Sequence, residues 1–439
     1  MYAVINGGTR PCGRVKVSGA KNSATRLLAA SLLTDKPVFL GNFPTHLVDV
    51  GHKIGFCETI GTRIAVDHAE GSLQIDASGL SDVQLTRDHY DVPIRTTYLL
   101  AAGQLARFGI ARIPYPGGCP IGGGSSGARG YDLHIMVWRA LGCEVAEKED
   151  HIEIKAKQLV GGNIRFPIST VGGTENALLC ASVAHGRTEI LNAYITPEID
   201  DLITFLRRMG AQIVVHGASH IIVEGSAGLL DSAHMQVMPD RIEALTWIIY
   251  GIIAAGEITI DNVPFSAMDV PLLHIAHAGV DLFRNSNSVH VTPECMPKGV
   301  QPFELACGAH PGIISDMQAF FVTMAVVGSG TSRVFDYRYP ERIAFVSELA
   351  KLVHGDVFEV DRGKIVVHGK TGFRPGVAYS TDLRGSMAAV MAALCADGQS
   401  VIHGVHMALR GYNDLTGKLA LLGADISIYE DDVPLADII

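Results

Sequence analysis

The sequence predicts an α/β protein of two lobes, in which apolar helices lie inside and β-sheets lie outside. Three observations predict this fold. The chain has 439 residues, 48% of them hydrophobic, which is more than a single hydrophobic core usually holds. A turn that ends a helix and precedes a strand recurs six times. The helices themselves, such as 387–394, are apolar on nearly every face, as buried helices are.

Each recurring turn has a glycine at its centre, and glycine readily adopts the left-handed conformation that ends many helices. The six glycines are Gly61, Gly142, Gly210, Gly279, Gly355 and Gly423. A unit of roughly 70 residues buries its helices poorly alone, so we expect three units to pack together, twice. The predicted architecture is a two-lobed inside-out α/β barrel built from six βαβαββ repeats, with three repeats in each lobe.

Within each repeat, an apolar helix precedes a strand rich in β-branched residues. The helices are predicted at 21–33, 95–107, 174–184, 241–255, 316–327 and 382–396. The strands that follow them are predicted at 38–40, 111–113, 188–190, 258–260, 332–334 and 400–402. Lobe I is expected to span residues 21–235. Lobe II is expected to contain residues 1–20 and 236–439, so that the chain enters it first and later returns.

Composition and charge exclude several classes of function. The net charge of −10 argues against a general nucleic-acid binder, because affinity for the phosphate backbone requires a basic face. The eight cysteines lack C-x-x-C spacing, and the eighteen histidines include no H-E-x-x-H motif. We therefore expect neither a metal ion nor a cofactor.

The sequence gives no sign of a membrane protein or of an exported one. The longest nearly apolar run, Ala244 to Gly256, is too short to span a bilayer and is typical of a buried helix. The segment Met1 to Gly8 lacks the basic and apolar regions of a signal peptide. We expect a cytoplasmic protein with no membrane partner and no obligatory protein partner.

A glycine-rich stretch at 116–130 carries Cys119 and Arg129. Glycine loses the most backbone freedom on ordering, so this run disfavours helix and strand and predicts a mobile loop. A thiol near guanidinium groups has a lowered pKa and can act as a nucleophile or a proton carrier. The alternative is a surface loop with an incidental cysteine, and the loop residues alone favour neither hypothesis.

Polar clusters open the first helix of each repeat. Serine, threonine and aspartate are explained there as helix N-caps. Lys21, Arg95 and Arg384 are not, because a cation at a helix N-terminus opposes the helix dipole unless an anion sits nearby. The other cations considered with them are Arg129, Arg338 and Arg410. Such a set predicts a substrate with phosphate and carboxylate groups, which arginine binds bidentately.

Seven short motifs lie in a fixed order along nearly the whole chain. They are Ser18-Gly19-Ala20-Lys21-Asn22, Pro116-Gly117-Gly118-Cys119, Ala128-Arg129 with Asp132-Leu133-His134, Pro239-Asp240-Arg241-Ile242-Glu243, Asp316-Met317-Gln318, Thr381-Asp382-Leu383-Arg384 and Arg410-Gly411-Tyr412. In these motifs the chain resembles the enolpyruvyl transferases, and within them the branch that acts on UDP-N-acetylglucosamine. The resemblance runs from about Arg10 to Asp425 and implies the same fold of six repeats.

The resemblance implies a role for each matched residue. Six cations would hold phosphoenolpyruvate, with Lys21 and Arg410 counted among the catalytic residues: Lys21, Arg95, Arg129, Arg338, Arg384 and Arg410. Cys119 would deliver a proton to C3 of phosphoenolpyruvate, and Asp316 would take the proton of the acceptor hydroxyl. Asp382 would assist proton transfer at the methyl carbon, and Asn22 would position the acceptor. The remaining substrate-binding residues would be Asp132, Leu133, His134, Thr170, Val171, Gly172 and Val334.

The sequence departs from the family pattern on the acceptor side. Gly130 stands where a proline packs on uracil, Leu99 where an aromatic residue is expected, and Ile168 where a lysine contacts a diphosphate. The loops at 119–130 and 167–172 are also longer than the family's. The resemblance therefore leaves the acceptor open between UDP-N-acetylglucosamine and another uridine nucleotide. An example of the second is UMP, modified at its 3′-hydroxyl in nucleoside-antibiotic synthesis.

The segment after Arg338 is also longer than the family's, because Pro340-Glu341-Arg342 is inserted or shifted. Arg26 and Arg342, which the family pattern does not require, could compensate for the missing lysine or serve a different phosphate.

Three other hypotheses are less favoured. Shikimate 3-phosphate as acceptor does not agree with the Pro-Gly-Gly-Cys loop. A non-catalytic binding relative would have lost expected site residues, and none is missing. An RNA-end-processing enzyme would share only the repeat architecture, and the acidic charge argues against it.

Overall fold

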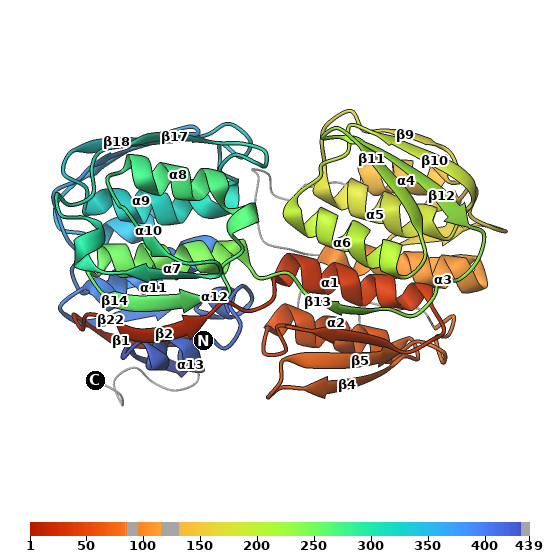
Figure 1. Cartoon of the computed structure of the whole chain (residues 1–439), viewed down its shortest axis with the longest axis horizontal. Coiled ribbons are helices and arrows are strands. Elements are labelled where there is room, and N and C mark those ends of the chain that lie inside the picture. Colours follow the sequence, from red (N-terminus) through yellow and green to blue (C-terminus); the bar gives the residue numbers. More distant parts are fainter. Residues whose placement is uncertain (84, 86–94, 116–130, 432–439) are drawn as a thin grey trace. The chain divides into compact units, whose positions relative to one another are not determined.

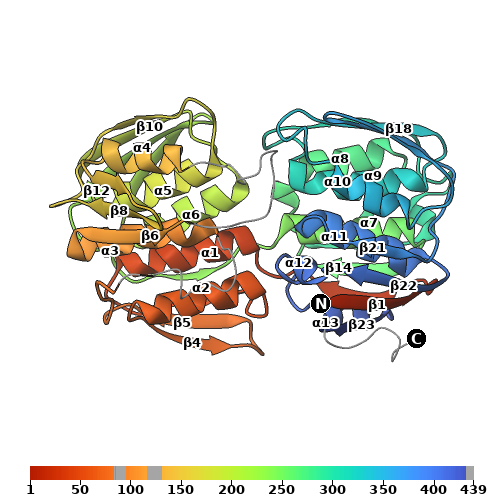
Figure 2. The same cartoon turned by 180° about the vertical axis from the view of Figure 1, so that it is seen from behind.

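The computed structural model describes residues 1–83, 85, 95–115 and 131–431, and the loop with Cys119 and Arg129 lies outside these ranges. The chain divides into two compact units, each with its own hydrophobic core (Figures 1 and 2). Among the described residues, unit 1 contains 1–18 and 239–431, and unit 2 contains 19–115 and 131–238. The chain passes between the units at 18–19 and 238–239, where the sequence predicted 20–21 and 235–236.

The described strands form three open sheets in each unit. In unit 1, the first sheet has the strand order β21 (Val377–Tyr379), β22 (Gly398–His403), β1 (Tyr2–Gly7) and β23 (Asp425–Tyr429). The second has the order β15 (Phe283–Arg284), β16 (Ser288–Val291), β14 (Glu257–Asp261) and β2 (Cys12–Lys16). The third has the order β17 (Glu304–Cys307), β18 (Thr331–Asp336), β20 (Lys364–His368) and β19 (Phe358–Asp361). In unit 2, the first sheet has the strand order β13 (His234–Gln236), β3 (Val38–Gly41), β5 (Ser72–Asp76) and β4 (Arg63–Asp67). The second has the order β6 (Ile110–Pro114), β8 (His151–Lys155) and β7 (Glu144–Glu147). The third has the order β11 (Gln212–His216), β12 (His220–Ser226), β10 (His185–Leu191) and β9 (Asn163–Arg165). None of these sheets of described strands closes on itself as a barrel.

The same pairing recurs in five of the six described sheets: one pair of strands is parallel and the others are antiparallel. Two parallel pairs join segments far apart in the sequence, β2 with β14 and β13 with β3. In addition, β1 lies between β22 and β23. The N-terminal segment therefore supplies one strand to each of two sheets of unit 1, and the other strands of these sheets come from later parts of the chain.

Helices fill the space between the sheets of each unit (Figures 1 and 2). In unit 2 they are α1 (Lys21–Ala30), η1 (Ser31–Leu33), α2 (Val48–Thr59), η3 (Arg95–Leu100), α3 (Ala101–Phe108), α4 (Asp132–Ala140), α5 (Val171–Ser182) and α6 (Pro197–Arg208). In unit 1 they are α7 (Arg241–Ile253), η4 (Phe265–Ala267), α8 (Asp269–His277), η5 (Pro293–Cys295), η6 (Ser315–Met317), α9 (Gln318–Val326), α10 (Ala344–Ala350), α11 (Leu383–Cys395), α12 (His406–Leu409) and α13 (Leu415–Leu421). Every residue of α7 and α9 is buried, which confirms that the apolar runs there are inner helices.

The six glycines of the predicted turns all have positive φ, between 76° and 100°. A side chain is strained in that region, so glycine is the residue that ends these helices at least cost. The predicted helices and the strands that follow them are present at all six positions, with ends that differ by a few residues. Two of the helices start with a 3₁₀ segment, η3 before α3 and η6 before α9.

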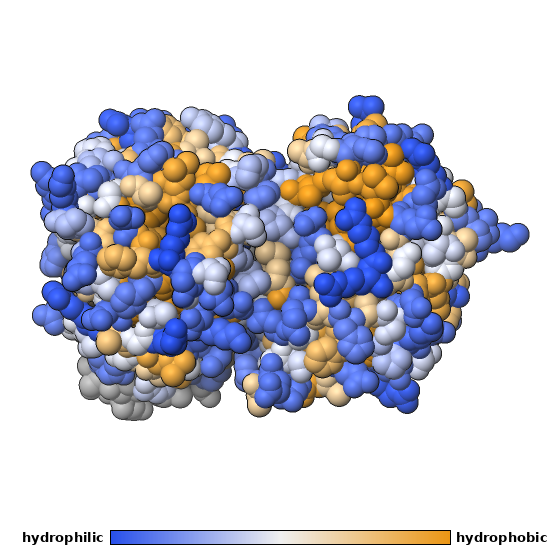
Figure 3. All heavy atoms as spheres, in the orientation of Figure 1, coloured by the Kyte–Doolittle hydropathy of each residue, from blue (hydrophilic) through white to orange (hydrophobic). Residues whose placement is uncertain are grey.

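No described helix combines the length and apolarity that crossing a membrane would require. Figure 3 shows hydrophilic side chains over most of the visible face, with apolar areas between them.

Candidate functional site

The residues that the sequence singled out fall into two groups, one in each unit. Unit 1 holds Asp316, Val334, Arg338, Asp382, Arg384 and Arg410. Unit 2 holds Lys21, Asn22, Arg95, Asp132, Leu133, His134, Thr170, Val171 and Gly172. Cys119 and Arg129 lie outside the described residues, and of Arg95 the structure describes only the backbone, at the start of η3.

In unit 1, two carboxylates and two guanidinium groups meet where η6 and α11 begin. The Arg342 Nη1 atom lies 2.7 Å from Asp316 Oδ1, and its Nη2 atom lies 2.9 Å from Asp382 Oδ1. The Arg384 Nε atom lies 3.4 Å from Asp316 Oδ2. The side chains of Arg342, Arg384 and Asp382 are 8% exposed or less, whereas that of Asp316 is 31% exposed. Asp316 is thus the member of the group that a ligand can reach.

The charges around Asp316 determine its protonation state. Burial alone would raise the pKa of this carboxyl group, but the neighbouring Arg342 and Arg384 guanidinium groups hold it well below its usual range. Burial would likewise lower the pKa of Arg342, and Asp316 and Asp382 raise it above the usual value instead. Asp316 is therefore ionised at neutral pH, as a general base must be.

Asp382 caps helix α11. Its Oδ1 atom accepts hydrogen bonds from the backbone N–H groups of Arg384, at 2.9 Å, and Gly385, at 3.3 Å. The same oxygen also accepts the bond from Arg342. The capping role that the sequence allowed for this aspartate is confirmed, and the cap fixes the carboxylate in the position where Arg342 binds it.

Arg384 packs against the Arg410-Gly411-Tyr412 motif. The guanidinium carbon lies 5.4 Å from the centre of the Tyr412 ring, within the range of a cation–π contact. A Cβ atom added to Gly411 would lie 3.2 Å from Arg384 Nη1. This Nη1 atom is buried and has no hydrogen-bond partner among the described residues. Arg410, which is 8% exposed, ends helix α12 beside them.

The structure brings Arg342 to the two aspartates. Arg338 lies four residues earlier, in a turn whose backbone N–H groups bind Asp336 Oδ1, and its guanidinium group stands 5.8 Å from the centre of the Tyr339 ring. The feature of the sequence that singled out Arg342 is the longer segment that follows β18. The side chain of Val334, in β18, is fully buried in the core of unit 1.

In unit 2, Lys21 is the first residue of α1, and its Nζ atom lies 2.5 Å from Asp49 Oδ2 on α2. The side chains are 14% and 6% exposed. Asn22, the next residue, is half-buried. The sequence predicted that a substrate phosphate or carboxylate binds at this helix start, and in the structure Lys21 pairs with a carboxylate of the protein itself. In unit 1, Arg384 likewise pairs with a carboxylate of the protein, that of Asp316.

Three segments of the predicted acceptor side meet in unit 2. The rings of Tyr98, in η3, and His134, in α4, lie 3.8 Å apart between centroids. A Cβ atom on Gly172, in the first turn of α5, would lie 3.1 Å from the His134 ring. Thr170 caps α5 by accepting the N–H bond of Gly173. Leu99, which stands where the family has an aromatic residue, is fully buried.

The other members of the unit 2 group lie on the same two helix starts. Asp132 is exposed and begins α4, and Leu133 after it is half-buried. Val171 is the first residue of α5 and is half-buried as well. The structure thus brings together the Asp132-Leu133-His134 and Thr170-Val171-Gly172 segments.

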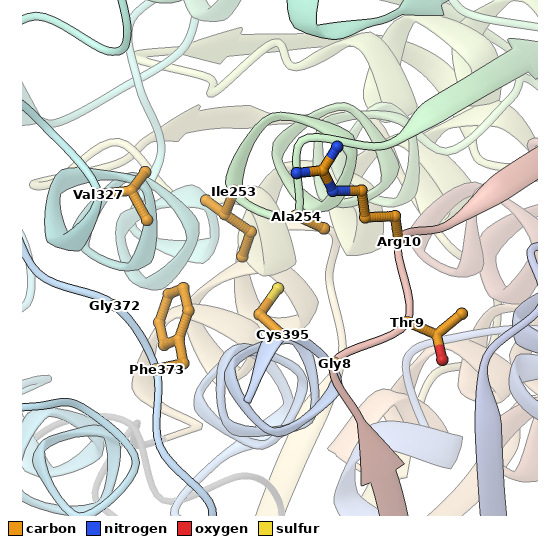
Figure 4. A pocket seen from close by; sticks show the side chains of 9 residues that line it. All are labelled: Gly8, Thr9, Arg10, Ile253, Ala254, Val327, Gly372, Phe373 and Cys395. Atoms are coloured by element: carbon orange, nitrogen blue, oxygen red, sulfur yellow. The ribbon is translucent and has the colours of Figure 1, made fainter. Parts of the chain in front are cut away.

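A cavity of about 240 Å³ in unit 1 is separate from these residues (Figure 4). It lies where α7, α9 and α11 end, and the candidate aspartates lie where η6 and α11 begin. The side chains of Ile253, Phe373 and Cys395 point toward one another across it. Burial raises the pKa of the Cys395 thiol well above its usual value, so this cysteine is a poor nucleophile.

Comparison with known proteins gives the family. The model of the EPSP synthase (3-phosphoshikimate 1-carboxyvinyltransferase) family matches residues 5–419. The UDP-N-acetylglucosamine 1-carboxyvinyltransferase of Trichlorobacter lovleyi is 34% identical over 424 residues, which are 96% of this chain and 98% of the relative. The enzyme of that name from Campylobacter hominis is 35% identical over 428 residues, 97% of this chain and 98% of the relative.

Solved structures agree with this result. The enolpyruvyl transferase NikO from Streptomyces tendae superimposes with a TM-score of 0.86 at 25% identity, over 97% of this chain and 98% of NikO. The EPSP synthase of Acinetobacter baumannii has a TM-score of 0.74 at 17% identity, over 98% of this chain and all of that one, and so shares the α/β fold. Because the family model and the relatives cover nearly its whole length, the chain belongs to the EPSP synthase family and is an enolpyruvyl (carboxyvinyl) transferase.

Proposed function

We propose that this enzyme transfers the enolpyruvyl group of phosphoenolpyruvate to a hydroxyl group of a uridine nucleotide, with UDP-N-acetylglucosamine as the leading acceptor. The observation that carries the proposal is the placement of Asp316, an ionised and accessible carboxylate held between two buried arginines. Arg384 also has an N–H group that no described residue binds, as a site for a phosphate or carboxylate requires. The names of the two relatives support the acceptor.

The chemistry follows from the polarity of phosphoenolpyruvate. Protonation at C3, for which Cys119 is the proposed donor, makes C2 electron-poor. The acceptor oxygen then attacks C2 and gives its proton to Asp316, which produces a tetrahedral ketal. Loss of phosphate from C2 and of one proton from C3, with Asp382 assisting, leaves the enolpyruvyl ether. Acid and base must therefore lie on either side of the same carbon.

The arginines that keep Asp316 ionised also restrain it as a base, because a strongly acidic carboxyl group holds a proton poorly. We propose that phosphoenolpyruvate resolves this conflict. Its phosphate or carboxylate group would bind Arg384, one of the two cations beside Asp316, and so weaken the attraction of that cation for Asp316. The pKa of Asp316 would then rise in the substrate complex.

We also propose that the six sheets and their helices are six βαβαββ repeats, three in each of the two lobes assigned from the sequence. The pairing shared by five of the sheets supports this, and so does the glycine turn that recurs after six helices. The sheet of β6, β8 and β7 has three described strands, and residues 86–94 and 116–130 nearby in sequence lie outside the description.

A specific observation favours UMP as the alternative acceptor. Ile168, which is 63% exposed, stands where a lysine would contact a diphosphate. Neither of the two extra arginines compensates, because Arg26 pairs with Glu175 and Arg342 pairs with Asp316 and Asp382. A missing charged hydrogen bond weakens binding by about 1.5–3 kcal/mol.

The acceptor is tested by offering UDP-N-acetylglucosamine and UMP separately with phosphoenolpyruvate. We expect phosphate release with UDP-N-acetylglucosamine and a product heavier by one enolpyruvyl group in the mass spectrum. An adduct on UMP alone would replace the acceptor and leave the reaction type in place. Absence of phosphate release with either nucleotide would contradict the proposed function.

Fosfomycin, an epoxide that resembles phosphoenolpyruvate, is expected to alkylate Cys119 before the other cysteines. Burial raises the pKa of Cys57 and of Cys143 to about 12, and that of Cys180 further, so these thiols are protonated and enclosed. Peptide mass spectrometry locates the adduct. As a control, Cys119→Asp should escape labelling and keep activity, because a carboxylic acid can also donate the proton. An adduct on the exposed Cys12 instead would remove Cys119 from its role.

A further inference from the structure

A buried ion network joins three helical segments in the core of unit 2. Glu175, on α5, accepts hydrogen bonds from Arg26 Nε on α1 through Oε2 and from the Tyr98 hydroxyl group in η3 through Oε1. The exposed fractions of Glu175, Arg26 and Tyr98 are 1%, 6% and 3%. Lys53, on α2, is also fully buried, and burial lowers its pKa to about 7 against the attraction of Cys57 and Glu175. The proposed chemistry uses none of these residues.

Tyr98 connects this network to the acceptor side of unit 2. Its ring lies on His134, with the ring planes 35° apart. A Cβ atom added to Gly172 would lie 3.0 Å from the Tyr98 hydroxyl oxygen and 3.3 Å from His134 Nε2. The hydroxyl end of Tyr98 therefore fills the space beside the first turn of α5. Glu175, His134 and Gly172 all contact one tyrosine side chain.

The bond to Glu175 determines where that side chain lies. A hydrogen bond to a carboxylate is stronger than one between neutral groups, and it holds the hydroxyl end of the tyrosine side chain in place. Arg26 occupies the other carboxylate oxygen, so Glu175 itself has little freedom to turn. Arg26 Nη1 has no hydrogen-bond partner among the described residues, so the network is not fully satisfied, but the two bonds to Glu175 still restrain its carboxylate. Without the bond from Tyr98, the hydroxyl end of that side chain could shift, and His134 and the start of α5 would move with it.

We propose that Tyr98 and Glu175 are positioning residues for the acceptor. Glu175 fixes Tyr98, and Tyr98 fixes His134 and the first turn of α5, the segments on which the uridine nucleotide binds under the proposed function. Neither side chain touches the reacting atoms. Their removal therefore changes the affinity for the acceptor and leaves the chemical step and the binding of phosphoenolpyruvate nearly as they were.

The test measures steady-state phosphate release by Tyr98→Phe. The concentration of the acceptor is varied at saturating phosphoenolpyruvate, and then that of phosphoenolpyruvate is varied at saturating acceptor. The acceptor is UDP-N-acetylglucosamine, or UMP if the wild-type enzyme uses only UMP. We expect the KM for the acceptor to rise roughly 10-fold or more, as the loss of a hydrogen bond to a charged group implies. The kcat and the KM for phosphoenolpyruvate should change by less than about 3-fold.

Tyr250→Phe is the matched control, because it removes the hydroxyl group of a tyrosine that is 1% exposed, on α7 of unit 1. It should leave the KM for the acceptor unchanged. Tyr98→Phe added to Glu175→Leu should raise that KM no further than Glu175→Leu alone, because leucine cannot accept the hydrogen bond of Tyr98 and both changes therefore break the same bond. If Glu175→Leu does not fold, Tyr98→Phe decides the test alone.

The outcomes separate this inference from the proposed function. A wild-type enzyme that releases no phosphate with either nucleotide contradicts the proposed function. An active wild-type enzyme with an unchanged KM for the acceptor in Tyr98→Phe overturns the positioning role alone. A fall in kcat with no change in that KM overturns it too, because Tyr98 would then act on the chemical step.

Discussion

Replacement of Asp316 by alanine is expected to lower kcat by about 10²–10⁴, the usual cost of a missing general base. The KM for phosphoenolpyruvate should change far less, because the base acts on the acceptor hydroxyl in the transition state. The structure supports this role, since Asp316 is ionised and is the most accessible of the four charged groups around it. Steady-state phosphate release with both substrates varied in turn measures the effect.

Asp261→Ala is the control for this experiment. Asp261 is 29% exposed, nearly as much as Asp316, and it also pairs with an arginine of unit 1, Arg14, at 2.6 Å. It lies in β14, away from η6 and α11. Its removal should leave kcat unchanged. If Asp316→Ala turned over at the wild-type rate, the base would have to lie elsewhere, with Asp382 as the next candidate.

Local patterns in the sequence predicted the fold well because the physical causes are themselves local. The glycines at 61 and 423, for example, are required by the backbone of the turns in which they lie, whatever packs around them. The helix predicted at 241–255 is buried over 241–253, where most residues on every face are apolar. The partners of β2 and β13 come from segments more than 190 residues away, and no local pattern specifies such pairing.

The sequence predicted which residues form the candidate site but not which of them pair with one another. The sequence identified Asp316, Asp382 and Arg384, and the structure brings them together. It noted Arg342 as an extra arginine but gave no sign that this side chain pairs with the two aspartates. The sequence likewise did not predict that Lys21 pairs with Asp49, because that contact depends on how α2 packs on α1.

Replacement of Arg342 by methionine is expected to lower the free energy of unfolding by about 3–5 kcal/mol at pH 7, the usual cost of removing one partner of a buried ion pair. The change would leave Asp316 beside the Arg384 guanidinium group, and Asp382 bonded to the backbone N–H groups of Arg384 and Gly385. Because Arg342 keeps the pKa of Asp316 low, the carboxyl group of the variant should take up a proton at a higher pH.

The pH dependence distinguishes this explanation from simple loss of packing. A lowered carboxyl pKa stabilises the fold above the unfolded pKa of about 4, and this stabilisation is lost as the pH falls through the folded value. In Arg342→Met the folded pKa of Asp316 is closer to the unfolded one, so the difference in stability between wild type and variant should stay constant from pH 7 to about pH 5 and narrow as the pH falls below about 4. Denaturant unfolding at several pH values, from neutral to well below about pH 4, measures this difference. Arg14→Met, which removes an arginine 69% exposed and paired with Asp261, should cost no more than about 1 kcal/mol. If the difference in unfolding free energy between wild type and Arg342→Met stayed constant over the whole pH range, the charge of Arg342 would not be what stabilises the two aspartates.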